Sequence, residues 1–108
     1  MTIMDKQQRK DLWDYIDASD VLEIVDVLAP CNPYGLDTDG YDGYAEALDD
    51  VRNAAEHDKA SGGVRLSVTK EHFEHWNGHV ATTASDHGYC NAVEDMLNSI
   101  AKLIAQRY

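Results

Sequence analysis

An acidic side chain stands at every third position between residues 11 and 26, and this spacing restricts how the segment can fold. Each three-residue step turns about 300° around an α-helix, so the carboxylates of one continuous helix would drift into its apolar side. A break near residues 17–19 removes that conflict. The spacing therefore predicts two short helices instead of one. The acids are Asp11, Asp14, Asp17, Asp20, Glu23 and Asp26.

Each of these two predicted helices gathers its apolar residues on one side, away from its acids. In the first helix they are Leu12, Trp13 and Ile16. In the second helix they are Val21, Ile24, Val25 and Leu28. Asp17 or Ser19 is the expected N-cap of the second helix, because a short oxygen-bearing side chain accepts a hydrogen bond from a free backbone N–H there. Pro30 is expected to end it.

Two longer helices are predicted further along the chain. Residues 31–40 are dense in turn formers and predict a loop, and a helix over about 41–59 follows, closed by Ser61-Gly62-Gly63. The buried side of that helix is expected to hold Tyr44, Ala47, Leu48, Val51, Ala54 and Ala55. The last helix, about 87–107, has the most regular apolar pattern, and we expect it to be the central core helix. Its apolar residues are Tyr89, Val93, Met96, Leu97, Ile100, Leu103 and Ile104.

The segment between these helices alternates apolar and polar residues over 64–68, which is typical of a short strand. Residues 79–83 are its candidate partner; otherwise the segment is simply extended. Thr69 is expected to cap a short helix that runs to about Trp76 and is interrupted at Asn77-Gly78. The fold class predicted is mainly α (α+β at most), a compact single domain over residues 1–108 with four to five short helices and at most one small β element.

Charge is distributed unevenly along the chain. The net charge is -11, and residues 1–60 hold 15 acids and 5 Lys or Arg, whereas residues 61–108 hold 5 acids and 4 Lys or Arg. Such a surface repels nucleic acid and anionic membrane and attracts basic proteins. Adaptation to high salt also enriches aspartate, but it should acidify the whole surface instead of one half.

Histidine and cysteine occur in a pattern that suggests a metal site. His72, His75 and His79 fall at i, i+3 and i+7, and His87 and Cys90 add another i, i+3 pair. These side chains suit Zn²⁺. Asn77-Gly78 is expected to break the helix before His79, however, and the set matches no zinc-finger spacing. We therefore expect no metal and no cofactor, and we expect Cys31 and Cys90 to be free thiols.

The aspartates of the loop at 37–43 raise the possibility of a calcium site. An EF-hand loop begun at Asp37 needs glycine at its sixth position and glutamate at its twelfth, and the chain has Asp42 and Leu48 there. A turn that leads into an acid-capped helix explains the same residues. No nucleophile elbow, phosphate loop or paired-histidine metalloprotease motif is present, so the protein is not expected to be an enzyme.

Two functional hypotheses from different classes follow. The first is an inhibitor that presents carboxylates to the basic surface of a nucleic-acid-binding protein, such as a nuclease or effector complex. In size, charge and architecture the chain is similar to the antirestriction and anti-CRISPR proteins of phages and plasmids, and to immunity proteins of nuclease toxins. The second is a metal-responsive regulatory domain that uses the His/Cys set. The expected partner-binding residues are Asp11, Asp14, Asp17, Asp20, Glu23, Asp26, Asp37, Asp39, Asp42, Glu46, Asp49 and Asp50.

The inhibitor hypothesis carries expectations about surroundings. We expect no direct contact with nucleic acid or membrane, and a location in the cytoplasm, that of the host cell if the protein is phage-encoded. The oligomeric state stays open, with a dimer as one option.

Overall fold

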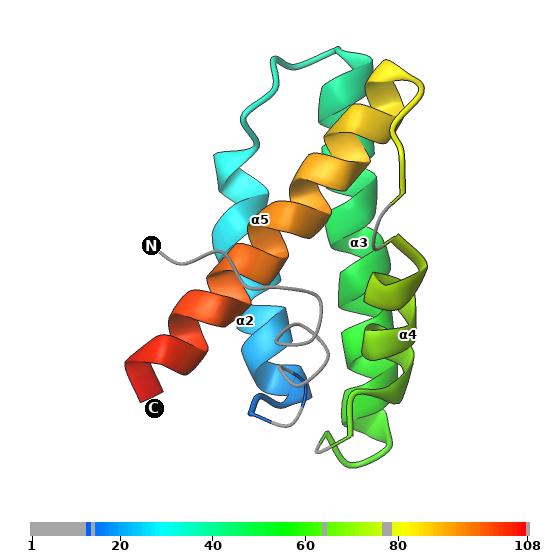
Figure 1. The fold of residues 1–108 in the computed structure, drawn as a ribbon. Helices are drawn as coiled ribbons and strands as arrows, with labels where there is room; N and C mark the ends of the chain where they lie inside the picture. Colours follow the sequence, from blue (N-terminus) through cyan, green and yellow to red (C-terminus); the bar gives the residue numbers. More distant parts are fainter. Residues whose placement is uncertain (1–12, 14, 64, 77–78, 108) are drawn as a thin grey trace.

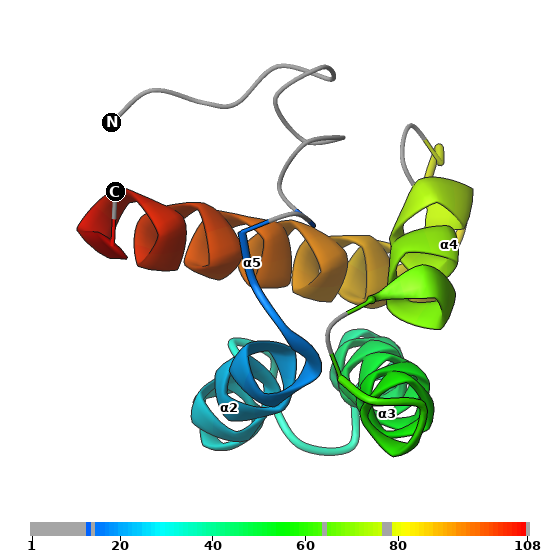
Figure 2. The same ribbon diagram turned by 90° about the horizontal axis from the view of Figure 1, so that it is seen from below.

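Four α-helices arranged in two layers make up the described part of the chain. The computed structural model describes residues 13, 15–63, 65–76 and 79–107. The elements are α2 (Ala18–Leu28), the 3₁₀ turn η2 (Ala29–Cys31), α3 (Asp39–Ala60), α4 (Ser67–Trp76) and α5 (Ala84–Arg107). Helices α2 and α3 run antiparallel in one layer, and α5 crosses over both (Figure 1). Seen along α2 and α3, the second layer consists of α5 and α4 (Figure 2).

The predicted break before residue 20 is present, and its cap is Asp17. The Asp17 carboxylate accepts from the Asp20 backbone N–H (3.0 Å), and the Asp20 carboxylate accepts from the Asp17 backbone N–H (3.1 Å). This reciprocal capping box starts α2 and prevents a longer helix. The helix predicted before it lies mostly outside the described residues. Of its apolar residues, Trp13 and Ile16 are buried, and the Trp13 ring lies 5.0 Å from that of Phe73 in α4.

Helix α3 begins two residues before and ends one residue after the predicted range of 41–59, and its N-cap is Thr38 instead of the expected acid. Thr38 accepts a bond from the backbone N–H of Tyr41 and caps the start, and the six residues of the predicted apolar side are all buried. At the other end Gly62 and Gly63 adopt positive φ angles of 118° and 80°, which only glycine adopts without strain. The carbonyl of Gly63 then accepts from the backbone N–H of Ala18, so the turn after α3 also fixes the start of α2.

The strand predicted over residues 64–68 is wrong, and so is the role given to Thr69. Residues 65, 66 and 79–83 form no strand, and α4 already begins at Ser67. The N-terminus of α4 is capped from another helix, because the buried carboxylate of Asp58 in α3 accepts from the backbone N–H groups of Val68 (3.1 Å) and Thr69 (2.9 Å). Thr69 therefore lies inside the first turn and also donates its hydroxyl to Asp58 (2.8 Å). Between the described residues 65 and 68, the buried side chain is Leu66, just before the helix begins.

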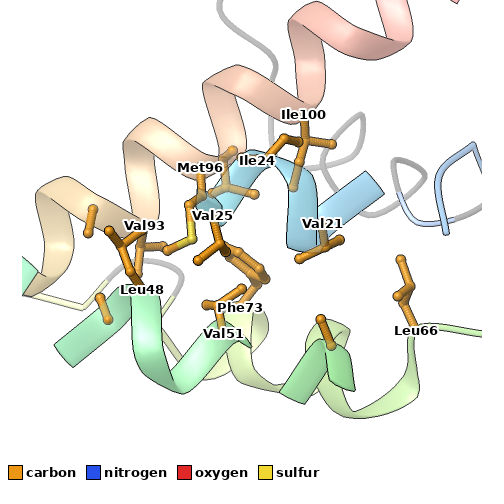
Figure 3. Close-up of a cluster of buried hydrophobic side chains, with 14 of the residues drawn as sticks. Val21, Ile24, Val25, Leu48, Val51, Leu66, Phe73, Val93, Met96 and Ile100 are labelled. Carbon is orange, nitrogen blue, oxygen red and sulfur yellow. The ribbon is translucent and has the colours of Figure 1, made fainter. Parts of the chain in front are cut away.

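The hydrophobic core lies between the two layers. Side chains from all four helices meet there, together with Leu66 from the connection before α4 (Figure 3). Helix α5 contacts α2, α3 and α4, and its most extensive packing is with α3, which also contacts the other three. The centre of the fold is thus the α3–α5 pair and not α5 alone. The cluster includes Val21, Ile24 and Val25 of α2, Leu48 and Val51 of α3, Phe73 of α4, and Val93, Met96 and Ile100 of α5.

Glycine allows α3 and α5 to approach closely where they cross. A Cβ atom on Gly43 would lie 2.0 Å from the carbonyl oxygen of Ser85, and one on Gly88 would lie 2.0 Å from that of Gly40. No real Cβ contact is that short, so any larger residue would push the helices apart. The crossing therefore depends on glycines inside helices, where glycine is otherwise unfavourable by about 1 kcal/mol relative to alanine.

The fold class is mainly α, as predicted. The described residues contain helices and no strand, and they form a single compact body with a Cα radius of gyration of 13.4 Å. That value agrees with the roughly 13 Å expected for one domain of this length. Within the described ranges, none of the helices has the length and apolar content that a bilayer-spanning segment requires.

Candidate functional site

A row of acids occupies the side of α3 that points away from the core. From Asp39 to Glu56 the exposed positions of the helix repeat at alternating steps of three and four, which keeps them on one face. Five of the six residues in this row are acidic, and the sixth is Asn53. We call the five acids the α3 acidic face; they are Asp39, Asp42, Glu46, Asp49 and Glu56. At 1.5 Å per residue, the face extends about 25 Å along the helix.

No ion pair joins this face to a cation within the described residues, and exposed Lys59 lies just past its end. The row contains no Lys or Arg, and none of its carboxylates takes part in an ion pair there. Arg52 of α3 turns instead toward α2, where its guanidinium donates to the exposed carboxylate of Asp26 at 2.8 Å. The α3 acidic face is therefore a concentrated patch of negative charge on a helix held in place by core packing.

Most acids in and next to α2 form hydrogen bonds or ion pairs within the protein. Asp20 is buried, at 8% exposure, and receives two bonds from the Arg107 guanidinium at the end of α5 (2.6 and 2.8 Å). These bonds hold the pKa of Asp20 below its ordinary value, against the opposing effect of burial. Asp17 caps the helix, and Asp26 accepts a hydrogen bond from Arg52. Glu23 is therefore the exposed acid of α2 that neither caps the helix nor pairs with an arginine.

The remaining predicted contact residues are divided between loop, helix and undescribed chain. Asp37 is exposed in the loop before α3 and has a positive φ of 66°. Asp11 and Asp14 lie outside the described residues. Asp50 is half-buried and faces α4 and α5 instead of joining the α3 acidic face. The structure thus gathers Asp39, Asp42, Glu46 and Asp49 into one surface and separates Asp20 and Asp50 from it.

Asp50 takes part in a hydrogen-bonded chain that links three helices. The Tyr89 hydroxyl of α5 donates to Asp50 Oδ2 at 2.6 Å, and His72 Nε2 of α4 lies 2.9 Å from the same hydroxyl oxygen. Because the single hydroxyl proton goes to Asp50, we assign the His72 proton to Nε2, which makes His72 the donor to Tyr89. Burial lowers the pKa of His72, and burial together with Asp50 raises that of Tyr89, so both groups are neutral at pH 7.

A shallow, open hollow lies between α3 and α4 and is bordered by Asp50 and His72 of this chain. Its volume is about 420 Å³. Its lining combines one carboxylate, one amide, two imidazoles and two apolar side chains: Asp50, Asn53, His57, His72, Ala54 and Val68. Asn53 belongs to the same row as the α3 acidic face, so the hollow lies along the edge of that face. The sequence gives no signal for this site, because its walls come from positions up to 22 residues apart and depend on how α4 is capped.

The histidines and cysteines do not form the set that their spacing suggested. Helix α4 ends at Trp76, so His79 leaves its face; the His79 ring instead lies 4.5 Å from the indole of Trp76. Trp76 in turn stacks on Tyr89 at 4.0 Å. The described residues include no group of three or more His, Cys, Asp or Glu side chains placed to hold a metal ion. Cys31 and Cys90 are free thiols, as predicted.

Comparison with known proteins adds no relative. No protein-family model matches the chain, and no curated protein or solved structure is significantly similar to it.

Proposed function

We propose that this protein is an inhibitor that binds the basic surface of a nucleic-acid-handling protein and occupies the place of its phosphates. The observation that carries the proposal is the α3 acidic face, five exposed carboxylates in one row with no cation among them. In this proposal the α3 acidic face binds a partner and catalyses no reaction. Generic solvation of a helix usually alternates acids with lysines four residues away, and this row lacks them.

The spacing of the face fits one strand of nucleic acid better than a duplex. Successive acids of the row between Asp39 and Asp49 lie about 4.5–6 Å apart along the axis of α3. One DNA strand advances about 3.4 Å per phosphate, so a strand 25 Å long carries about seven charges, against five on the α3 acidic face. Since the acids of α2 are mostly engaged in internal bonds, we assign the mimicry to α3 with support from Asp37 and Glu23.

A double substitution tests this assignment. Glu46→Gln with Asp49→Asn removes two charges from the middle of the face, while Glu71→Gln with Glu74→Gln removes two exposed charges from α4 as a matched control. Exposed ion pairs contribute about 0.2–1 kcal/mol each, so the first variant should lose about tenfold in affinity for the partner at low salt. The control should lose less than threefold.

The assay is competition. The partner is captured from the source cell extract, purified, and bound to labelled DNA and RNA in the presence of increasing amounts of this protein. The proposal expects displacement of the nucleic acid, weakened in the face variant and at high salt. A partner that binds nucleic acid equally well when saturated with this protein would refute it. A nuclease as the captured partner would favour the immunity-protein form of the same chemistry.

The metal-responsive alternative has less support. Its histidines are divided among α4, the connection after it and α5, and the described residues give it no ligand set. We therefore carry forward the inhibitor proposal alone.

A further inference from the structure

The hollow between α3 and α4 has the composition of a receptor for a cation with an apolar stem. Asp50 supplies a carboxylate whose Oδ2 is fixed by Tyr89 at 2.6 Å; within the described residues, its Oδ1 takes part in no hydrogen bond. Ala54 and Val68 supply apolar wall on the two sides, one from each helix. A ligand that fits this lining needs a positive end for Asp50 and a hydrocarbon part for the walls.

The negative charge of the hollow excludes an anionic ligand. His72 is a neutral imidazole that donates its Nε2 proton to Tyr89, so it adds no positive charge to balance Asp50. The α3 acidic face, whose row includes the lining residue Asn53, adds negative potential nearby. A phosphate or carboxylate is therefore repelled. A bound metal ion is also disfavoured, because no group of three ligand side chains is assembled in the described residues.

Arginine and lysine are the two side chains with a cation on an apolar stem, and arginine fits this hollow better. The guanidinium group is planar, is more weakly hydrated than an ammonium, and stacks on flat rings, and the imidazoles of His57 and His72 line the hollow. Its donors form a fork that matches a carboxylate. The three methylenes of the side chain bury readily against apolar walls while the charged end stays polar.

We infer that this hollow receives an arginine side chain of the partner, with the guanidinium on Asp50 and the stem against Ala54 and Val68. That this arginine belongs to a nucleic-acid-handling protein rests on the proposed function. The inference adds to it a short-range contact that long-range attraction to the α3 acidic face does not provide. Arginine is enriched among the few residues that carry most of the binding energy of protein interfaces.

The direct test uses small probes in place of the partner. Nα-acetyl-arginine amide is titrated into the ¹⁵N,¹³C-labelled protein at pH 8, where histidine is normally neutral, with the lysine and citrulline analogues as matched probes. Citrulline keeps the shape of arginine without its charge. We expect saturable shifts centred on Ala54, Val68 and His72, with a dissociation constant at least fivefold lower for arginine than for lysine, and no binding of citrulline. Equal shifts from lysine and arginine spread along the α3 acidic face would overturn the inference.

Two substitutions separate the hollow from its charged surroundings. Asp50→Asn keeps an acceptor for Tyr89 and removes the charge, while Asp49→Asn makes the same change one residue away on the exposed face. Arginine binding should weaken at least tenfold in the first and less than twofold in the second. Equal effects would contradict a site at Asp50. If Asp50→Asn fails to fold, Val68→Phe fills the hollow from its exposed rim and should block the probe without touching the carboxylate.

The failure of this inference and the failure of the proposed function look different. If arginine does not bind the hollow, while the purified partner still loses its nucleic acid to this protein, the hollow inference is wrong and the function stands. If the probe binds as expected but the partner keeps its nucleic acid, the arginine site is upheld and the inhibitor proposal falls.

Discussion

Replacing Asp58 by alanine should remove the cap of α4 and cost a large part of the stability of this fold. Asp58 is 3% exposed, and its carboxylate accepts three hydrogen bonds at 2.8–3.1 Å, from two backbone N–H groups and the Thr69 hydroxyl. Thr69 itself is fully buried, so its freed donors have no access to water. The substitution therefore leaves unsatisfied polar groups as well as removing bonds.

The magnitude follows from those contacts. A hydrogen bond to a charged group contributes about 1.5–3 kcal/mol, and loss of an N-cap typically costs about 0.5–2 kcal/mol. Because the three bonds share one carboxylate, their contributions do not add fully, and we expect Asp58→Ala to cost about 3–5 kcal/mol. Domains of this size have a total stability of about 5–15 kcal/mol. The thermal midpoint should fall by roughly 15 °C.

Urea unfolding followed by circular dichroism measures this cost. Asp58→Asn, which keeps one acceptor oxygen, should fall between the wild type and Asp58→Ala, and the exposed Asp49→Ala is the control, with a change below about 0.5 kcal/mol. A cost under 1 kcal/mol for Asp58→Ala would refute the capping argument. It would show that α4 is held by its apolar contacts alone.

Three further predictions follow from the core, the helix crossing and the hydrogen-bonded chain. Ile100→Ala, at a fully buried position, should lower the free energy of unfolding in urea by about 2–5 kcal/mol. A change below about half a kcal/mol would show that Ile100 is not part of the core. Gly88→Ala should destabilise the protein despite the better helix propensity of alanine, because its Cβ would meet the Gly40 carbonyl; a gain in thermal midpoint would show that the helices separate easily. The lowered pKa of His72 means that the folded state binds fewer protons than the unfolded one below about pH 6.5, so stability should fall as pH drops through that range. His72→Gln should lose this part of the pH dependence, and identical slopes between pH 7.5 and 5.5 for wild type and variant would contradict it.

Helix positions were predictable from the sequence where a helix buries a regular apolar side. The pattern of α3 and α5 identified most of their buried residues, although Leu103 and Ile104 of α5 are only partly buried. The conflict among the acids of residues 11–26 identified the break that Asp17 caps. These features depend on neighbours within one or two turns. They are therefore visible in a single sequence.

What escaped prediction depends on contacts between distant segments. The start of α4 is fixed by Asp58, on another helix, so the local alternation before it suggested a strand. From its position in the first turn of a helix, Asp20 was expected to be exposed. It is instead covered by Arg107, which lies 87 residues away in the sequence and donates hydrogen bonds to it. The hollow beside Asp50 likewise exists only because α4 packs on α3 and Tyr89 reaches across from α5.

The α3 acidic face also has a consequence for the protein when it is free. Three successive pairs between Asp39 and Asp49 are like charges three or four residues apart, each of which destabilises a helix by about 0.2–0.5 kcal/mol. The free protein thus carries about 1 kcal/mol of self-repulsion along α3 that the core must outweigh. Added salt screens this repulsion, so it should make the fold more stable while it weakens the proposed complex. A basic partner of the kind proposed would relieve the same repulsion on binding. The bound protein should then resist unfolding more strongly than its contacts with that partner alone would provide.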